Sequence, residues 1–307
     1  MKIYLNSLNE DWVVDQFIAE WNKYRKDVIA RQIKEADIVW IIAPWTWRKI
    51  SKRQLKNKKV ICTIHHIDFA KFNKKEEAEF NKRDKYVNYY HTISQKTKKQ
   101  IQRLTDKEIF VIPFWLNQNN FFQIANKELL KEKYNLSKES FFIGSYQRDT
   151  EGGDLVSPKL SKGPDRLIEI LLSKKETIKN MEIILTGKRR NYLINEFKKV
   201  GIKYKYFEMV NIQELNELYN VLDLYIVSSR IEGGPRSLFE CAITRTPIIS
   251  TDVGFASELL HPSSIFNMNN FQEALPNIEY AYKNVQYYTL PMGLESFDSM
   301  FKEIYEN

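Results

Sequence analysis

Short apolar segments alternate with amphipathic stretches through most of the chain, and this alternation most narrows the folds open to it. DIVWIIA (37–43) and MEIILTG (181–187) have the length and apolar content of buried strands. PDRLIEILLSKK (164–175) places leucines and isoleucines on one helical face. Because short buried strands separated by helices indicate parallel sheets, we expect an α/β fold.

The strand-like segments are too numerous for one small sheet. They cover residues 2–5, 37–43, 59–65, 89–94, 109–114, 140–146, 181–187, 223–229 and 247–251. A connection over 115–139, which begins with a polar stretch, separates them into two groups. We therefore predict two Rossmann-like domains with parallel sheets that face an interdomain cleft, the first over residues 1–122 and the second over 123–290.

Composition narrows the class of protein. Hydrophobic residues make up 43% of the 307 residues, which is enough for packed cores and excludes a disordered chain. The N-terminus lacks the apolar core of a signal peptide, and the longest apolar run, 36–45, is too short to cross a bilayer. Cys62 and Cys241 have no zinc-site spacing. We expect a cytoplasmic protein.

Positive charge is concentrated in the first part of the chain. Residues 1–130 hold 25 Lys and Arg against 15 Asp and Glu, whereas residues 131–307 hold 22 against 24. Seven of these basic residues fall within 48–59, RKISKRQLKNKK, which contains no acid. Two interpretations stay open: a lysine-biased but merely solvated surface, or a surface that meets an anionic partner such as a membrane or an acidic glycan.

Residues 230–254, RIEGGPRSLFECAITRTPIISTDVG, carry the pattern most specific for a ligand. Their first part, RIEGGPR (230–236), joins the predicted strand 223–229 to a predicted helix, SLFECAI (237–243). This turn lies at the carboxyl edge of a parallel sheet, where ligands bind in open α/β sheets. Gly233 and Gly234 permit a close approach to the backbone, and Pro235 suits the first helical turn. The helix would then offer free N–H groups to a phosphate, and these belong to Arg236, Ser237 and Leu238.

Two glutamates bracket this predicted phosphate site. Glu232 precedes it, and Glu240 lies four residues after Arg236, on the same helical face. A purely anionic ligand does not need carboxylates, but a ligand with phosphates and several hydroxyls does. The pattern therefore predicts a sugar nucleotide.

The segment also resembles the signature of the retaining glycosyltransferases of family four, which have the GT-B fold. Their pattern is Glu, seven residues, Glu, with Gly-x-Pro near the first and a strand ending in Val-Gly after the second. Four other segments agree in order and spacing with that family: ICTIHH (61–66), HTISQKTKKQI (91–101), VIPFWLNQNNF (111–121) and SKGPDRLIEIL (161–171).

The resemblance implies a role for each matching residue. Glu232 would hold hydroxyls of the donor sugar, and Glu240 would hold the ribose. Arg148 and Lys162 would neutralise the leaving diphosphate, as the chemistry also requires. The remaining contacts would come from the amides of residues 234–238 to the diphosphate and sugar, from Phe207, Met209 and Val210 near the base, and from His65 or His66 near the sugar.

The chain departs from the family at the start of the second domain, and it lacks one motif. The family has Gly-Arg at the start of the second domain, whereas here Arg148 follows Gly144 by four residues. TEGGDLVSPKL (150–160) is then inserted before Lys162. No Asp-x-Asp motif is present, so we expect neither a metal nor another cofactor, and the donor is a substrate.

The resemblance also assigns the ends of the chain. The first domain would bind the acceptor, and the last segment, about 291–307, would form a helix that packs back on that domain. Phe297, Met300, Phe301 and Ile304 make one apolar stripe for this packing. Trp12 and Trp45 are the aromatic candidates for acceptor contact.

Each assignment has a plainer alternative. Glu240 could be a solvated helix residue, Glu232 a helix-terminus charge, Lys162 an ordinary loop lysine, and the two histidines a structural pair. For the whole chain, the first hypothesis is a metal-independent glycosyltransferase acting on a glycan or lipid-linked acceptor, peripheral at the inner face of a membrane. The others are a sugar-nucleotide epimerase or hydrolase of the same fold, and a polyanion-binding protein. No recognised nucleic-acid module is present.

Overall fold

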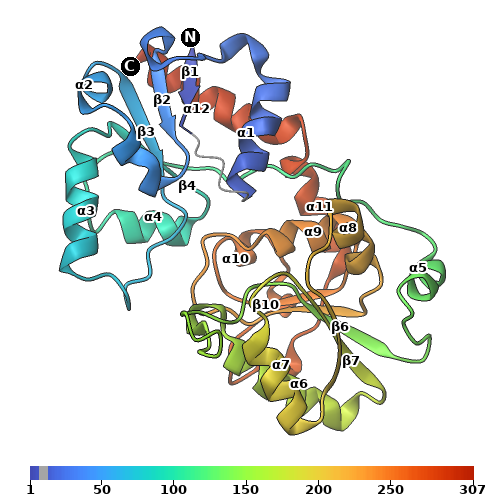
Figure 1. Cartoon of the computed structure of the whole chain (residues 1–307). Coiled ribbons are helices and arrows are strands. Elements are labelled where there is room, and N and C mark those ends of the chain that lie inside the picture. The colour runs from blue at the N-terminus through green and yellow to red at the C-terminus, as the bar shows by residue number, and fades with distance from the viewer. Residues whose placement is uncertain (7–12) are drawn as a thin grey trace. The chain divides into compact units, whose positions relative to one another are not determined.

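The computed structural model describes residues 1–6 and 13–307, and these form two compact units (Figure 1). The N-terminal unit comprises residues 1–115 and 290–307, and the C-terminal unit comprises residues 116–289. The division falls seven residues before the boundary expected from the sequence, because Phe121 is buried in a core of the C-terminal unit. The Phe122 amide also donates to Asn216 of that unit, at 3.0 Å.

The N-terminal unit is built on a five-stranded parallel sheet. Its strands lie in the order β1-β2-β3-β4-β5, the same as their order along the chain. The strands are β1 (Ile3–Leu5), β2 (Ile38–Ile41), β3 (Lys59–Thr63), β4 (Tyr89–Thr92) and β5 (Ile109–Val111). The helices are α1 (Val13–Tyr24), α2 (Lys52–Lys56), α3 (Lys74–Asp84), α4 (Gln95–Ile101) and α12 (Glu295–Glu306).

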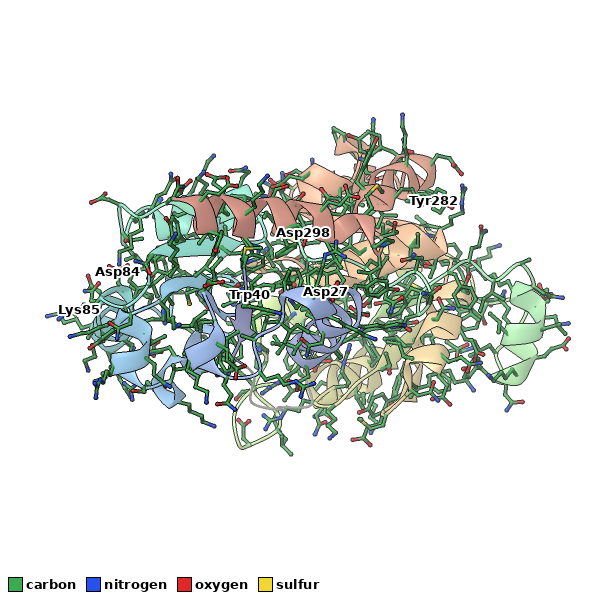
Figure 2. The ribbon with its side chains drawn as sticks, turned by 90° about the horizontal axis from the view of Figure 1, so that it is seen from above. Asp27, Trp40, Asp84, Lys85, Tyr282 and Asp298 are labelled. Atoms are coloured by element: carbon green, nitrogen blue, oxygen red, sulfur yellow. The ribbon has the colours of Figure 1, made fainter. Side chains whose placement is uncertain are left out.

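Helix α12 belongs to the N-terminal unit, although it ends the chain. All four residues of its predicted apolar stripe are buried in the core that holds Trp21, Trp40 and Trp115. The Phe297 ring lies 5.5 Å from Trp40 and 5.2 Å from Trp115. Figure 2 labels Asp298, which lies on α12, and Trp40, which lies on β2. The prediction that the last helix packs on the first domain is confirmed.

The C-terminal unit is built on a six-stranded parallel sheet. Its strands are β6 (Phe141–Ser145), β7 (Met181–Thr186), β8 (Lys203–Phe207), β9 (Leu224–Val227), β10 (Ile248–Thr251) and β11 (Ile265–Phe266). Its helices are α5 (Lys127–Lys133), α6 (Pro164–Thr177), α7 (Asn191–Val200), α8 (Ile212–Asn220), α9 (Arg236–Thr244), α10 (Ala256–Leu259) and α11 (Ile278–Val285).

Both faces of this second sheet are covered. Along β6, Phe142 belongs to one core and Ile143 to another, because successive side chains of a strand point to opposite faces. In β9, Tyr225 and Ile226 divide between the same two cores. A parallel sheet buried on both faces has nearly continuous apolar strands. For that reason the short apolar run within 223–229 was enough to predict β9.

Candidate functional site

The strand order places a topological switch point in the C-terminal unit. The order β11-β10-β9-β6-β7-β8 runs outward in both directions from β6 and β9, which are parallel neighbours with Gly144 opposite Tyr225. Ligands of doubly wound sheets bind at such a switch point, beyond the carboxyl ends of the strands. Residues 146–148 follow β6, and residues 228–232 follow β9. The sequence-predicted Arg148 and Glu232 therefore lie on the two segments that leave this edge.

Backbone contacts hold a third segment against these two. The amides of Arg230 and Ile231 donate to the Ser161 carbonyl at 2.8 and 3.1 Å. Gly163 has φ +63°, and a Cβ at this position would lie 2.0 Å from the Ser228 carbonyl oxygen. Only glycine permits this approach. The contact fixes the position of Lys162.

Lys162 and Glu232 meet as an ion pair. The Lys162 ammonium contacts Oε1 of Glu232, and the Ser229 hydroxyl donates to the same oxygen at 3.2 Å. The side chains are 21% and 9% exposed, respectively. The Gln147 amide donates to the Lys162 carbonyl at 2.9 Å. Lys162 is therefore part of a polar cluster with Glu232, Ser229 and Gln147.

Arg148 is exposed, and its Nε donates to the Thr150 carbonyl at 2.8 Å. Its charge and that of Lys162 both act on Lys159, a half-buried lysine that the sequence analysis did not assign. Burial lowers the pKa of Lys159, and these two cations lower it further. Lys159 therefore lies close enough to Lys162, Arg148 and Glu232 for all three charges to act on it.

A third glycine, Gly254, packs closely against the backbone of Gly233 and Gly234. Gly254, which ends the segment STDVG after β10, has φ +55°, and a Cβ there would lie 2.4 Å from the Gly233 carbonyl oxygen. The same atom would lie 2.9 Å from the Gly234 Cα. The turn before α9 and the turn after β10 therefore pack backbone to backbone. This contact explains why the Val-Gly of the sequence pattern accompanies the Gly-Gly-Pro.

Helix α9 begins one residue before the predicted helix, and Pro235 precedes its first turn instead of lying within it. Arg236 is its first residue, and Pro235 is the N-cap, with φ −58° and ψ 124°. The Leu238 amide donates to the Pro235 carbonyl at 3.1 Å. The expectation that Leu238 offers a free amide is therefore wrong, because a tight first turn uses that donor. The positive end of the helix dipole still lies at this turn.

Glu240 is buried, with 8% of its surface exposed, so it is not a solvated helix residue. The Tyr219 hydroxyl donates to its Oε2 at 2.7 Å, and Arg236 Nε lies 3.8 Å from its Oε1. The predicted shared face of Arg236 and Glu240 is thus observed. Burial raises the pKa of Glu240, whereas Arg236 and Tyr219 act in the opposite direction.

The residues predicted near a nucleotide base lie at the end of β8 and just after it. Phe207 and Val210 are partly buried and pack against the core that also contains Leu238 and Phe239. Met209, between them, is 67% exposed. They precede α8, which starts with a capping box between Asn211 and Glu214.

The two candidate histidines lie in the N-terminal unit, just after β3. His65 Nε2 donates to the Ile42 carbonyl at 3.0 Å, and its ring stacks on Phe114. Burial lowers the pKa of His65 to about 4, so the ring is neutral at neutral pH. His66 is exposed. Two tryptophans were named as acceptor candidates. The ring centroid of Trp45 lies 6.2 Å from that of His65, and Trp12 lies outside the described residues.

The basic segment 48–59 spans several elements of the N-terminal unit, and not all of its charges face solvent. Arg48 pairs with Glu79. Lys58 donates to the carbonyls of Lys34 and Ala36, at 3.2 and 2.5 Å. Another lysine of the segment donates to a carbonyl of α12. The exposed charges on α2 are Lys52, Arg53 and Lys56.

Within residues 1–6 and 13–307, no three His, Cys, Asp or Glu side chains gather as a metal site would require. No helix in the described part of the chain is long and apolar enough to cross a membrane.

Comparison with known proteins identifies the class. The profile of the family described as Glycosyl transferases group 1 matches residues 157–288, within the C-terminal unit. A sequence comparison with curated proteins returned no match.

Solved structures share the fold over nearly the whole chain. Alr3699/HepE of Anabaena, in complex with UDP-glucose, is 12% identical at a TM-score of 0.78, with 98% of this chain and 99% of that chain covered. The sucrose-phosphate synthase of Thermosynechococcus elongatus is 13% identical at a TM-score of 0.72, and the match covers 98% of this chain and 81% of that chain. The lipopolysaccharide outer core galactosyltransferase WaaB is 12% identical at a TM-score of 0.67, and the match covers 99% of this chain and 100% of that chain. The fold is therefore GT-B, and with its group 1 domain the chain is a glycosyltransferase.

Proposed function

We propose that the chain is a retaining glycosyltransferase, of the family-four type, that takes its sugar from a nucleoside diphosphate donor without a metal ion. The observation that carries this proposal is the arrangement around α9. A Lys162–Glu232 pair lies before the helix, the dipole lies at its first turn, and the buried Glu240 lies one turn inside it. Such a site offers positive groups to phosphates and carboxylates to hydroxyls.

The proposed roles follow from these positions. Glu240 accepts hydrogen bonds from the ribose, and Glu232 accepts them from the sugar. When the bond between the sugar and the diphosphate breaks, its electron pair passes to the phosphate oxygen. Lys162, Arg148 and the amides of α9 stabilise that charge as it develops, which favours the transition state over the ground state. The structure of Alr3699/HepE with UDP-glucose makes UDP-glucose the first donor to test.

For the acceptor, we propose a glycan or a lipid-linked glycan that binds the N-terminal unit. The charges of Lys52, Arg53 and Lys56 would attract an anionic membrane or an anionic acceptor. This assignment is independent of the donor site, which lies in the C-terminal unit.

The test begins with thermal shift against UDP-glucose, UDP, GDP and ADP, and continues with nucleotide release in the presence of acceptor extracts. Proton NMR of the product reports the anomeric configuration, and inversion would refute the retaining mechanism. Conversion or hydrolysis of the donor without acceptor would indicate an epimerase or hydrolase.

A separate experiment tests metal independence. Full activity after exhaustive treatment with a chelator is expected, and loss of activity that Mg²⁺ or Mn²⁺ restores would refute metal independence.

A further inference from the structure

The insertion between Arg148 and Lys162 folds as a short hairpin. Thr150 and Pro158 form an antiparallel bridge, and the Glu151 amide donates to the Ser157 carbonyl at 2.9 Å. The tip, residues 152–157, is exposed, whereas Thr150 is fully buried. The hairpin therefore has a fixed base, and that base lies at the carboxyl end of β6.

A buried ion pair anchors this base. Asp149 is 1% exposed and Arg190 is fully buried, and Arg190 Nε donates to Asp149 Oδ2 at 2.6 Å. The Asp149 carbonyl accepts from the Lys159 amide at 2.7 Å, and the Lys159 carbonyl accepts from the Lys162 amide at 2.8 Å. The backbone of Lys159 is thus hydrogen-bonded to Asp149 on one side and to Lys162 on the other.

The side chain of Lys159 is half-buried among other charges. Lys162 and Arg148 repel its ammonium group, and Glu232 and Glu151 attract it. Holding the half-buried Lys159 ammonium near two other cations costs electrostatic energy. A bound polyanion would offset that cost, because each positive group then gains an opposite charge.

We propose that Lys159 is a third cationic ligand of the diphosphate, acting beside Lys162 and Arg148. The inference rests on the proposed function, since it assigns a further residue to the same donor site. It also gives the insertion a role, which is to carry Lys159 to the phosphates from a hairpin fixed at its base.

The test compares binding of UDP, UMP and uridine by calorimetry, with GDP and ADP and their nucleosides as substitutes if the protein prefers another base. Lys159→Met removes the charge and keeps most of the length. Affinity for the diphosphate should fall roughly tenfold or more, the range of a charge-assisted hydrogen bond. Affinity for the nucleoside should not change, and Lys159→Arg should keep most of the diphosphate affinity.

Lys179→Met is the matched control, because Lys179 is an exposed lysine just before β7, at the opposite edge of the sheet. If wild-type protein binds none of the three diphosphates, the proposed function fails and this inference fails with it. If the wild type binds a diphosphate and Lys159→Met binds it equally well, only the inference is overturned. Equal losses of nucleoside and diphosphate affinity would assign Lys159 a structural role instead and would also overturn it.

Discussion

The Lys162 ammonium and the Glu232 carboxylate are in direct contact, although 70 residues separate them along the chain. The Gly163–Ser228 approach creates this contact, because it holds the segment before α6 against the segment after β9. A cation and a carboxylate are thereby placed together at the carboxyl edge of the sheet.

Replacing Lys162 tests the chemical role of this pair. Lys162→Ala should lower kcat on the order of a hundredfold, a loss similar to that of other transition-state charge stabilisers. Binding of the nucleoside alone should change little, because the role proposed for the lysine is on the departing diphosphate. Steady-state kinetics and nucleoside titration measure the two effects. A variant that loses nucleoside affinity while keeping its turnover would contradict the role.

Glu240→Gln tests the ribose assignment. The variant keeps the size of the side chain but weakens a charge-assisted hydrogen bond, so nucleotide should bind about tenfold or more weakly. The same carboxylate predicts a pH dependence, because its pKa is raised and only its ionised form accepts strongly from a hydroxyl. Affinity of wild type for nucleoside should therefore fall as pH drops through that raised pKa. Glu240→Gln should show no such step, and parallel profiles for the two proteins would exclude the assignment.

Gly163→Ala should destabilise the C-terminal unit. The added Cβ meets a backbone oxygen at 2.0 Å, and the φ of +63° is strained for alanine. A cost of about 1–3 kcal/mol is expected, visible as a lower Tm. Gly153→Ala is the matched control, since a Cβ there has no neighbour within 4 Å. Equal Tm values for the two variants would show that the Gly163 contact is not tight in solution.

Phe297→Ala tests the return of α12 to the N-terminal unit. Phe297 is fully buried among aromatic rings, and truncation of such a side chain costs about 3–5 kcal/mol. Denaturant unfolding followed by tryptophan fluorescence should report the loss, because Trp40 and Trp115 are direct neighbours. Lys302→Ala, on the exposed face of the same helix, should leave the free energy of unfolding nearly unchanged. Similar stability for both variants would argue against the packing.

The exposed charges of α2 predict membrane binding. Wild-type protein should sediment with anionic vesicles at low salt and release as salt rises, since each basic residue near the surface contributes about 1 kcal/mol. Combined Ser replacement of Lys52, Arg53 and Lys56 should weaken sedimentation and leave nucleotide affinity intact. The matched control removes three exposed lysines from α3, namely Lys74, Lys75 and Lys82. No binding by the wild type would favour a merely lysine-rich surface.

Lys58, part of the same basic segment, belongs in a separate variant. Its ammonium joins two backbone carbonyls of the N-terminal unit. Lys58→Ser should therefore lower Tm more than it affects vesicle binding. The sequence alone grouped Lys58 with the surface charges, because lysines with structural and solvated ammonium groups look alike in a charge count.

Local pattern was enough to predict most of the architecture. The nine apolar segments all contain strands, because strands buried on both faces are apolar along their length. The two missed strands lack that signal. In β8, Lys203 and Lys205 alternate with aromatics at the edge of the sheet, and β11 is only two residues long.

The candidate site likewise contains some residues that the sequence pattern indicated and others that it did not. Glu232, Gly233 and Glu240 lie within one strand–turn–helix segment, so their spacing alone indicated a ligand for the first turn of α9. Tyr219 and Lys159 had no such signal, because hydrogen bonds and charges bring them to the site from separate elements. The sequence by itself therefore determined nine of the described strands and the Gly-Gly-Pro turn before α9. Tertiary structure decided which side chains meet, because backbone approaches such as Gly163 to Ser228 and Gly254 to Gly233 join segments that are distant along the chain.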